Sequence, residues 1–293
     1  NSEVIIPAMT YCSTAFSVIN CGLKPVLVDI GRNKSSIDIN MIQKEITSKT
    51  KVIMPVHLYG QVCDMDAIRL IAEKNNLYII EDCAQSHFSE YNGERAGTMG
   101  IAGSFSFFPG KNLGAYGDAG GIITDDEDLA LKCRLFARHG ALKKHEHQIE
   151  GINSRLDALQ AAVLSVKLPH IIDWTKARQE KAAYYTKGLN DIKAIELPLI
   201  RSNSKHSFHL YVIKVDERDE LQAYLKQNGI STGIHYPSSL PLLNAYSSRG
   251  FKFSDFPDAA DNSQRILSLP IYPEITKEQQ DYVISKLQEF YGE

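Results

Sequence analysis

Lys111 is the residue in this chain whose type and surroundings point most directly to chemistry. It lies in the run SFSFFPGKNLG (residues 104–114), where Phe105, Phe107 and Phe108 make the segment too apolar to lie flat on a surface. A lysine in apolar surroundings can be held neutral, and a neutral amine is a nucleophile toward aldehydes. For a lysine taken alone, a solvated position in a glycine-rich turn is the simpler interpretation. Only the neighbouring residues can distinguish it from a nucleophilic lysine.

Three further polar residues fit around such a lysine. Asp82 ends an apolar run earlier in the chain, and a carboxylate there can keep a pyridine nitrogen protonated, so that the ring withdraws electrons from an attached carbanion. Gln85 follows closely and can reach a ring hydroxyl, while Ser106 ends an apolar run and can bond a phosphate. Together these residue types predict pyridoxal phosphate chemistry. A capping role at an acidic strand end is the alternative for Asp82.

The same segment excludes two nucleotide-binding loops. In a P-loop the first glycine would fall at Phe105, and a serine or threonine would stand where this chain has Asn112. The glycines within residues 114–120 lack the spacing of a dinucleotide-binding turn, and they lead into a predicted strand rather than a helix. These glycines instead allow the backbone to approach a ligand closely.

The composition is that of an ordinary globular protein, and 293 residues are enough for two domains. A net charge of −3 gives no reason to expect nucleic acid or an anionic membrane as a partner. No apolar run approaches the roughly 20 residues that span a bilayer, and no secretory leader is visible. The five cysteines are scattered and lack C-x-x-C spacing, which predicts reduced thiols in a cytoplasmic protein and no metal site.

Short apolar runs alternate with amphipathic stretches in the first half of the chain. We expect strands at residues 4–7, 25–30, 51–56, 77–81, 103–108 and 121–124, with helices between several of them, such as residues 66–75. This alternation predicts an α/β fold with a largely parallel sheet that helices cover on both faces. In such sheets ligands bind beyond the carboxyl ends of the strands, where Asp82 and the turn after Phe108 would fall.

A second pattern begins near Ser154 and predicts a smaller α+β domain. Ser154 and Asp157 have the spacing of a helix cap, and a polar helix over residues 174–189 leads away from the first domain. Beyond it we expect strands at 208–215 and 231–235, a helix at 219–228, a long loop at 237–261 and a final helix beginning at Thr276. The predicted division is a large domain over residues 1–172, then a linking helix and small C-terminal domain over 173–293.

Five sequence blocks resemble, in order, those of the DegT/DnrJ/EryC1/StrS sugar aminotransferases, which are fold type I pyridoxal phosphate enzymes. The blocks are PAMTYCST (7–14), PVHLYGQ (55–61), EDCAQ (81–85), SFSFFPGKNLG (104–114) and GINSRLD (151–157). The resemblance implies a large, mostly parallel sheet domain sandwiched by helices, and a smaller α+β C-terminal domain. It also implies that a helix and a phosphate-binding Gly-Thr turn precede Asn1, so we expect the N-terminal part of the large domain to be missing from this sequence.

The resemblance implies cofactor roles at matched positions. Lys111 would bind pyridoxal 5′-phosphate covalently and move the proton between substrate carbon and cofactor. Asp82 would bind the pyridine nitrogen, Gln85 the ring oxygen and Ser106 the phosphate. Tyr11 would stack on the cofactor face, although an aromatic in the core of a strand is the alternative for this residue.

Block 151–157 implies a second subunit. Asn153 matches a family asparagine that reaches the phosphate of the cofactor bound in the partner, so the resemblance implies a homodimer with shared active sites. Arg155, in the same block, is a candidate substrate-binding residue.

Two other segments are candidates for sugar recognition. His235 and Tyr236 lie in GIHYP (233–237), which resembles the small-domain loop of members that act on nucleotide-linked 3-keto-6-deoxy sugars; a plain loop histidine is the alternative. Lys144 and His147 lie in KHEH, where relatives often carry Lys-Tyr-x-His, and SSLP (238–241) stands where relatives often carry a proline and a histidine. Both departures affect sugar recognition. A metal site at KHEH lacks a third ligand, so a solvated basic loop is the better interpretation.

Residues and resemblance together predict an aminotransferase that moves an amino group from glutamate to a nucleotide-linked keto-deoxy sugar, with C3 favoured and C4 as the alternative. Products of this family feed surface polysaccharides, such as O-antigen, or glycosylated natural products. A pyridoxamine phosphate-dependent sugar dehydratase is a second interpretation, but those relatives carry histidine in place of the cofactor-binding lysine, and Lys111 argues against it. A non-catalytic regulatory homologue is the third.

Overall fold

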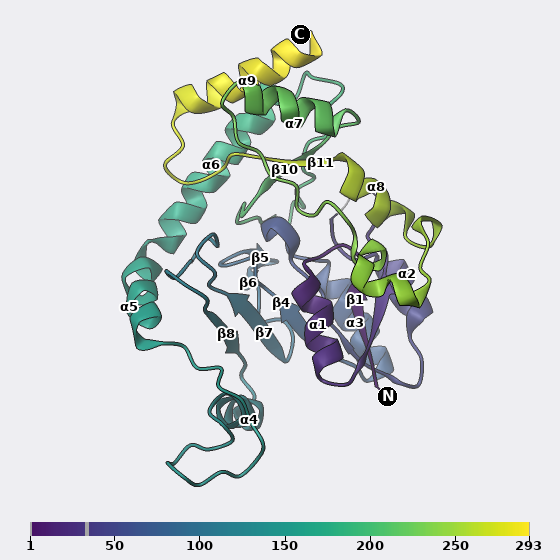
Figure 1. Ribbon diagram of the computed structural model, residues 1–293, viewed down its shortest axis with the longest axis vertical. Helices are drawn as coiled ribbons and strands as arrows, with labels where there is room; N and C mark the ends of the chain where they lie inside the picture. The colour runs from purple at the N-terminus through teal and green to yellow at the C-terminus, as the bar shows by residue number, and fades with distance from the viewer. Residues whose placement is uncertain (1, 33–34, 293) are drawn as a thin grey trace.

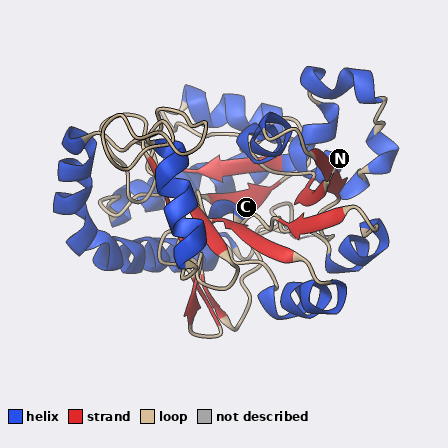
Figure 2. Ribbon diagram, turned by 90° about the horizontal axis from the view of Figure 1, so that it is seen from below, coloured by secondary structure: helices blue, strands red, loops and turns tan. Residues whose placement is uncertain are grey.

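The computed structural model describes residues 2–32 and 35–292. Within them, the large sheet has six strands, of which all but the last run parallel to their neighbours (Figure 1; Figure 2). In spatial order the strands are β2 (Lys24–Val28), β1 (Glu3–Pro7), β3 (Thr50–Ile53), β4 (Tyr78–Asp82), β7 (Ala102–Ser106) and the antiparallel edge strand β8 (Gly120–Ile123). The six strands predicted for the first half of the chain are confirmed, and so is the α/β fold class.

Helices cover both faces of this sheet because successive residues of a strand point to opposite sides. In the central strand β1, Ile6 packs on the side of helix α1 (Cys12–Asn20). Ile5 packs on the other side, in one cluster with residues of α2 (Ile39–Glu45) and α3 (Met65–Asn75). All five residues of β1 are buried, as a central strand between two helical layers requires.

The parallel arrangement places the carboxyl ends of β1, β3, β4 and β7 on one edge of the sheet. Tyr11 follows β1, Asp82 ends β4, and Lys111 follows β7. The register pairs Asp82 with Ser104, so the loop after β7 begins beside the end of β4. Residues that are far apart in the sequence therefore meet at this edge.

Helices connect the large sheet to the second half of the chain. An exposed segment, residues 138–157, follows helix α4 and extends away from the body of the molecule (Figure 1). The elements in this part are α4 (Glu127–Ala137), α5 (Ala158–Lys167), the short 3-10 helix η2 (Leu168–His170) and the long helix α6 (Ile171–Leu189). The predicted polar helix over 174–189 is confirmed within α6.

The predicted helix cap at Ser154 is wrong. Helix α5 begins at Ala158, and Asp157 before it has extended backbone angles. The amide of Ser154 donates instead to the carbonyl of Ala137, at 3.0 Å. This backbone pairing with the end of α4 holds Ser154 outside the helix, and no side chain caps the first turn of α5.

The second half of the chain is a smaller α+β unit. Its strands β10 (Tyr211–Lys214) and β11 (Ile266–Leu269) pair antiparallel, and α6, α7 (Arg218–Gln227) and α9 (Lys277–Tyr291) enclose a common core with them. Helix α9 begins as predicted, because Thr276 and Gln279 form a capping box. The strand expected at 231–235 is wrong: only one bridge forms there, between Gly233 and Ser268.

The long loop expected over residues 237–261 is also wrong. It contains the 3-10 helices η3 (Leu240–Leu242), η4 (Asn244–Arg249) and η5 (Phe253–Asp255) and the start of helix α8 (Pro257–Arg265). Leu240 and Phe256 lie in the same core cluster as Ile6, and the amide of Leu240 donates to the carbonyl of Ala8 at 2.8 Å. Spaced apolar side chains therefore hold this segment on the large sheet.

A third, small sheet and one more 3-10 helix complete the described elements that bear on the site: β6 (Glu94–Arg95), β5 (Glu90–Tyr91), β9 (Ser204–Lys205) and η1 (Leu58–Gly60). The division of the chain at residue 172 stays a prediction. None of the described helices has both the length and the apolar character needed to cross a bilayer.

Candidate active site

Asp82 is held in a fixed orientation at the end of β4. The hydroxyl of Thr14, in the first turn of α1, donates to Asp82 Oδ2 at 2.8 Å, and the amide of Ala84 donates to Oδ1 at 3.1 Å. The Thr14 hydroxyl lies in turn 3.0 Å from that of the buried Thr10. Each carboxylate oxygen thus has one protein donor and a lone pair left for a ligand.

Lys111 is half-buried in the loop after β7. Its amide donates to the carbonyl of Phe108 at 2.8 Å, which closes a tight turn ahead of the side chain. Burial disfavours the ammonium form and lowers the pKa of Lys111 below its ordinary value, and the nearby Asp82 carboxylate opposes part of this shift. Asp82 and Lys111, both predicted to hold a cofactor, are therefore near enough for the charge of one to shift the pKa of the other.

Gln85 is buried and connects the edge of the sheet to the small unit. Its Oε1 accepts from the amide of Tyr59 at 2.7 Å, and its Nε2 donates to the hydroxyl of Tyr236 at 3.0 Å. The hydroxyl of Tyr59 donates to the carbonyl of His235. Tyr59 thus fixes both Gln85 and the backbone ahead of Tyr236.

Tyr11 and His235, both predicted site residues, also lie at this edge, beside Tyr236. The rings of Tyr11 and Tyr236 lie 5.5 Å apart, with Tyr11 exposed at the start of α1, so the alternative of a buried strand aromatic is wrong. His235 Nδ1 is 2.8 Å from Ser268 Oγ, and burial, followed by the charge of Lys111, lowers the pKa of His235. Burial and the Asp82 charge raise the pKa of Tyr236, so its hydroxyl keeps its proton.

Ser106 is the last residue of β7 and lies half-buried before the lysine loop. Its backbone pairs with Gly120 of β8, and its hydroxyl is 3.4 Å from the amide of Phe108, which donates to it. This weak contact leaves the hydroxyl able to bind an anion at the strand end.

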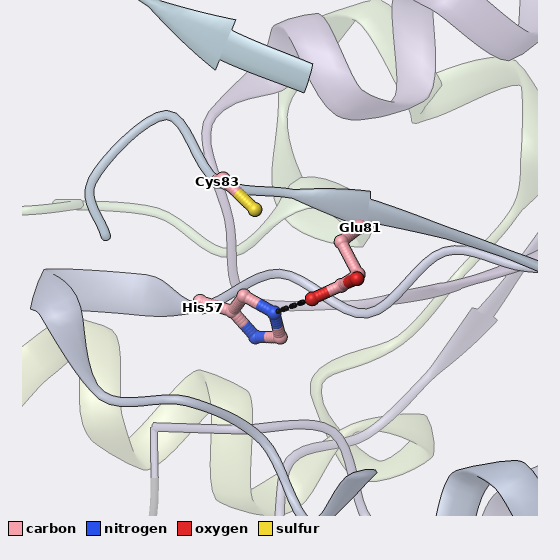
Figure 3. A group of neighbouring side chains, drawn as sticks. All are labelled: His57, Glu81 and Cys83. Atoms are coloured by element: carbon pink, nitrogen blue, oxygen red, sulfur yellow. Dashed lines mark hydrogen bonds and ion pairs between the residues drawn. The ribbon is translucent and has the colours of Figure 1, made fainter. Parts of the chain in front are cut away.

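Behind Asp82, a buried network anchors the strand end. Glu81 accepts hydrogen bonds from the amides of Gly97, Met99 and Gly100 at 2.7–2.8 Å and pairs with His57 Nε2 at 2.9 Å (Figure 3). Burial raises the pKa of Glu81, but the bonds from His57 and the amides outweigh it, so the net pKa is lowered.

His57, Glu81 and Cys83 also have the composition of a metal site, with donor atoms within 4.8 Å of one another. The protein itself uses these donors. Both Glu81 oxygens are occupied, His57 Nδ1 accepts the amide of Cys63 at 3.2 Å, and burial raises the pKa of the Cys83 thiol. The cluster is therefore explained as a structural anchor.

Four predicted residues lie apart from this group, in the exposed segment 138–157. Arg155 Nε donates to Asn153 Oδ1 at 3.1 Å, His147 Nδ1 lies 2.7 Å from the carbonyl of His139, and Lys144 is exposed. None of them contacts Lys111, Asp82 or Gln85 within the described part of the chain. A single chain thus brings together Tyr11, Asp82, Gln85, Ser106, Lys111, His235 and Tyr236, but not these four.

Thr14 and Tyr59 contact the group and were not predicted. Thr14 lies one helical turn after Tyr11 and could have been found from that spacing and its hydroxyl. Tyr59 lies in block 55–61, but its contact to His235 joins residues 176 positions apart, which no local pattern indicates.

Comparisons with known proteins identify the family of this chain. The profile of the DegT/DnrJ/EryC1/StrS aminotransferase family matches residues 1–288. The chain is 47% identical over 291 residues to the pleiotropic regulatory protein of Geobacillus stearothermophilus, covering 99% of this chain and 78% of that protein. It is 44% identical over 288 residues to the dTDP-3-amino-3,6-dideoxy-alpha-D-galactopyranose transaminase of Aneurinibacillus thermoaerophilus, covering 98% and 78%.

The crystal structure of Streptomyces venezuelae DesV in complex with a ketimine intermediate superposes with a TM-score of 0.97 at 38% identity, and covers 100% of this chain and 79% of that chain. The match extends over both the large sheet and the smaller α+β unit. It confirms the predicted fold type I architecture. The chain therefore belongs to the DegT/DnrJ/EryC1/StrS aminotransferase family.

Proposed function

We propose that this aminotransferase moves an amino group from glutamate to the C3 keto group of a nucleotide-linked deoxy sugar, with C4 as the alternative position. The observation that carries the proposal is the placement of Lys111, a half-buried amine at the carboxyl edge of the sheet whose pKa responds to the Asp82 carboxylate. The cofactor is pyridoxal 5′-phosphate, as in the solved members of the family.

The residues at the edge fit this cofactor. Asp82 retains lone pairs for a pyridinium N–H, and the Lys111 amine has no hydrogen-bond partner among the described residues that would compete with attachment to an aldehyde. Tyr11 is exposed where it can cover one face of the ring, and Ser106 can bind the phosphate. When bound, the cofactor supplies an aldehyde for the amine and a ring that accepts negative charge from the adjacent carbon.

Lys111 has two tasks in this proposal. It attaches the cofactor before the reaction, and its free amine then carries a proton. The lowered pKa keeps more of the amine neutral near neutral pH, so the amine would take the proton from Cα of glutamate and hold it for the return step. With the sugar as second substrate the same amine works in the reverse direction and delivers the proton to the sugar carbon that receives nitrogen.

Asp82 and Gln85 act by position. Asp82 would accept the pyridine N–H and keep that nitrogen protonated, while Thr14 holds the carboxylate in place. Gln85, fixed between Tyr59 and Tyr236, would bind the ring oxygen. His235 and Tyr236 approach the edge from the small unit, where they would contact the sugar. The choice of C3 is supported by the name of the 44% identical transaminase.

The exposed segment 138–157 supports a homodimer with shared active sites. Apolar side chains are exposed within it, at Leu142, Ile149, Ile152 and Leu156, and also at Leu159 in α5. Exposed apolar side chains gathered in this way are typical of an interface. In the dimer, Asn153 would reach the phosphate in the partner's site, and Lys144, His147 and Arg155 would contact the sugar nucleotide there.

Subunit mixing tests the shared site. Homodimers of Lys111→Ala and of Asn153→Ala should each be impaired. A mixed dimer, formed by subunit exchange, contains one site in which both residues are intact, so mixing should restore activity. No restoration, in a mixture whose mixed dimers are demonstrated by differently tagged subunits, would place Asn153 in the site of its own chain.

A regulatory role without catalysis is the second candidate, because a 47% identical relative is named a pleiotropic regulatory protein. Absorbance separates the two. Purified protein given pyridoxal 5′-phosphate should develop a visible band that glutamate removes. A protein that takes up no cofactor would support the regulatory role.

A panel of nucleotide-linked 3-keto and 4-keto sugars, incubated with protein and ¹⁵N-glutamate, identifies the product by mass spectrometry. Incorporation of ¹⁵N into a 3-keto sugar supports the proposal. Incorporation only into a 4-keto sugar corrects the position, and loss of water without nitrogen uptake identifies a dehydratase.

All five cysteines are free, which supports the predicted cytoplasmic location.

A further inference from the structure

The residue that follows Lys111 is tied to the second half of the chain. Asn112 is buried, and its Nδ2 donates to the carbonyl of Ser207 at 3.1 Å. Its Oδ1 lies 3.1 Å from Nδ1 of His209. Ser207 and His209 immediately precede β10, so a side chain next to the candidate catalytic lysine is held by a segment about a third of the chain away.

The two contacts together determine the tautomer of His209. A carbonyl oxygen can only accept, so the amide nitrogen of Asn112 must face Ser207 and its oxygen must face the imidazole. An amide oxygen can only accept as well, so His209 Nδ1 carries the hydrogen. The Nε2 atom of His209 is then an acceptor, and no described residue donates to it.

The backbone that presents His209 is strained. Phe208 has a φ of 43°, in the left-handed region that residues with a side chain avoid. Three contacts hold it: its amide donates to His206 Nδ1 at 2.9 Å, its ring stacks on that of His206 with centroids 4.0 Å apart, and its carbonyl accepts from the buried Arg178 at 3.0 Å. Strain of this kind persists only where the surroundings enforce it, and it gathers at functional sites.

Arg178 connects this strained turn to the rest of the small unit. It lies on α6, and the same Nη1 atom also donates to the carbonyl of Ile271 at 3.0 Å. On the other side, the amide of Ser207 donates to the carbonyl of Gly60 at 3.2 Å, beside Tyr59. The position of His209 is therefore fixed from both halves of the chain.

We propose that His209 is a positioning residue for Lys111, which acts by holding the Asn112 side chain through Nδ1–H. With the Lys111 amide bonded to Phe108 and the Asn112 side chain bonded to Ser207 and His209, the chain is held on both sides of the lysine. The lysine can then direct its amine to one place without a hydrogen bond of its own. This inference rests on the proposed role of Lys111.

The surroundings of His209 favour its neutral form, which suits a positioning residue beside Lys111. Burial lowers the pKa of His209 well below its ordinary value, and the charge of Lys111 lowers it further. A neutral imidazole adds no positive charge beside an amine that has to lose its proton. A protonated histidine would also carry hydrogen on both ring nitrogens and would repel the lysine.

Two substitutions separate the nitrogens of His209. In His209→Asn the amide nitrogen replaces Nδ1 and can still donate to Asn112, while Nε2 is absent. In His209→Gln the polar group lies where Nε2 was, and the bond to Asn112 is lost. The affinity for pyridoxal 5′-phosphate, measured by absorbance, should stay within about twofold of the wild type for the Asn variant and fall about tenfold for the Gln variant.

A second measurement does not require turnover. In the protein freed of cofactor, the pH dependence of Lys111 modification by an amine-reactive reagent reports the pKa of the amine, and peptide mass spectrometry locates the modified residue. The Gln variant should move this curve toward that of an ordinary lysine, because a loosened loop exposes the amine to water; the Asn variant should not. If the chain fails to transaminate any sugar, this curve still tests His209.

Asn112→Ala gives an independent check. It should reproduce the His209→Gln curve, and the double variant should be no worse than either single one, because both remove the same contact. The proposal is overturned if Asn at position 209 is as harmful as Gln, because a donor in the place of Nδ1 would then not be sufficient; an Asn variant that is worse than the Gln variant would assign the role to Nε2. It is overturned as well if neither changes the Lys111 curve or the cofactor affinity.

Discussion

The hydroxyl of Thr14 donates a 2.8 Å hydrogen bond to Oδ2 of Asp82, and so joins the first turn of α1 to the end of β4. The two residues are 68 positions apart in the sequence, and their elements are brought together only by the parallel sheet. The bond leaves the carboxylate with one protein donor on each oxygen. It explains how an acid at a strand end is held in the orientation that a pyridinium group requires.

Thr14→Val should weaken the binding of pyridoxal 5′-phosphate by about tenfold, because the substitution keeps the shape of the side chain but removes the donor to a charged group. Absorbance titration of the cofactor measures this. Thr14→Ser keeps the hydroxyl and should bind nearly as tightly as the wild type. Equal affinities for Val and Ser would mean that the hydrogen bond has no part in holding the carboxylate.

Asp82→Asn should lower the pKa of Lys111 further. Burial already lowers this pKa, and the Asp82 charge is what opposes it, so removing the charge leaves burial unopposed. The neutral amine then exists at lower pH, and the pH curve for chemical modification of Lys111 in cofactor-free protein should move in the acid direction. A shift toward alkaline pH would contradict the electrostatic relationship described for the pair.

Lys111→Ala should reduce transamination by at least about a thousandfold, since it removes both the attachment point and the proton carrier. The fold should persist, because the substitution removes a desolvated amine and breaks no hydrogen bond to a described residue. Circular dichroism and thermal unfolding check the fold. Lys111→Arg keeps a positive charge but no amine that can attach the cofactor, and should be equally inactive; an active Arg variant would refute the role of Lys111.

Glu81→Gln should destabilise the protein by about 3 kcal/mol at neutral pH. The NH₂ group of the glutamine would face N–H donors whose hydrogen bonds the carboxylate now accepts. Denaturant unfolding measures the change. Glu94→Gln is the matched control: Glu94 pairs with Arg69 at the surface, and its loss should cost less than about 1 kcal/mol. A similar cost for both variants would show that the buried network does not anchor the strand end.

The stability of the wild type and that of the Glu81→Gln variant should respond differently to acid. The pKa of Glu81 is lowered in the folded state, so its stabilising effect is complete above the unfolded pKa and is lost as the pH falls through the folded one. Wild type should therefore lose more stability in acid than Glu81→Gln, and the gap between them should narrow. If the difference in unfolding free energy between the two proteins stayed constant down to the folded pKa of Glu81, the ionised form of Glu81 could not be the cause of that difference.

Much of the sheet and the centre of the site were predictable from local patterns. The strand that ends at Asp82 and the strand that ends at Ser106 are short apolar runs, and alternation with helices implies that such strands run parallel. Parallel strands put their carboxyl ends together, so the sequence already implied that Asp82 and Lys111 meet. The cap of α9 at Thr276 was equally local, because it depends on two residues three positions apart.

Errors arose where distant parts of the chain decide the local conformation. Ser154 has the spacing of a cap, but its amide is bonded to Ala137, which keeps the backbone extended. Residues 237–261 read as a loop because their apolar residues have no regular period. Leu240 and Phe256 nevertheless pack with Ile6, so the large sheet determines their structure.

The sequence by itself determined which chemical groups are available and on which strand ends they lie, because residue type and hydrophobic period are local properties. Only the tertiary structure decided which groups touch. It brought Tyr236 to Gln85 and His209 to Asn112, and it left Asn153 exposed, away from the lysine of its own chain. The physical reason is that such contacts depend on how the two halves of the chain pack together, and hydrophobic burial fixes that packing without leaving a pattern in any short stretch of sequence.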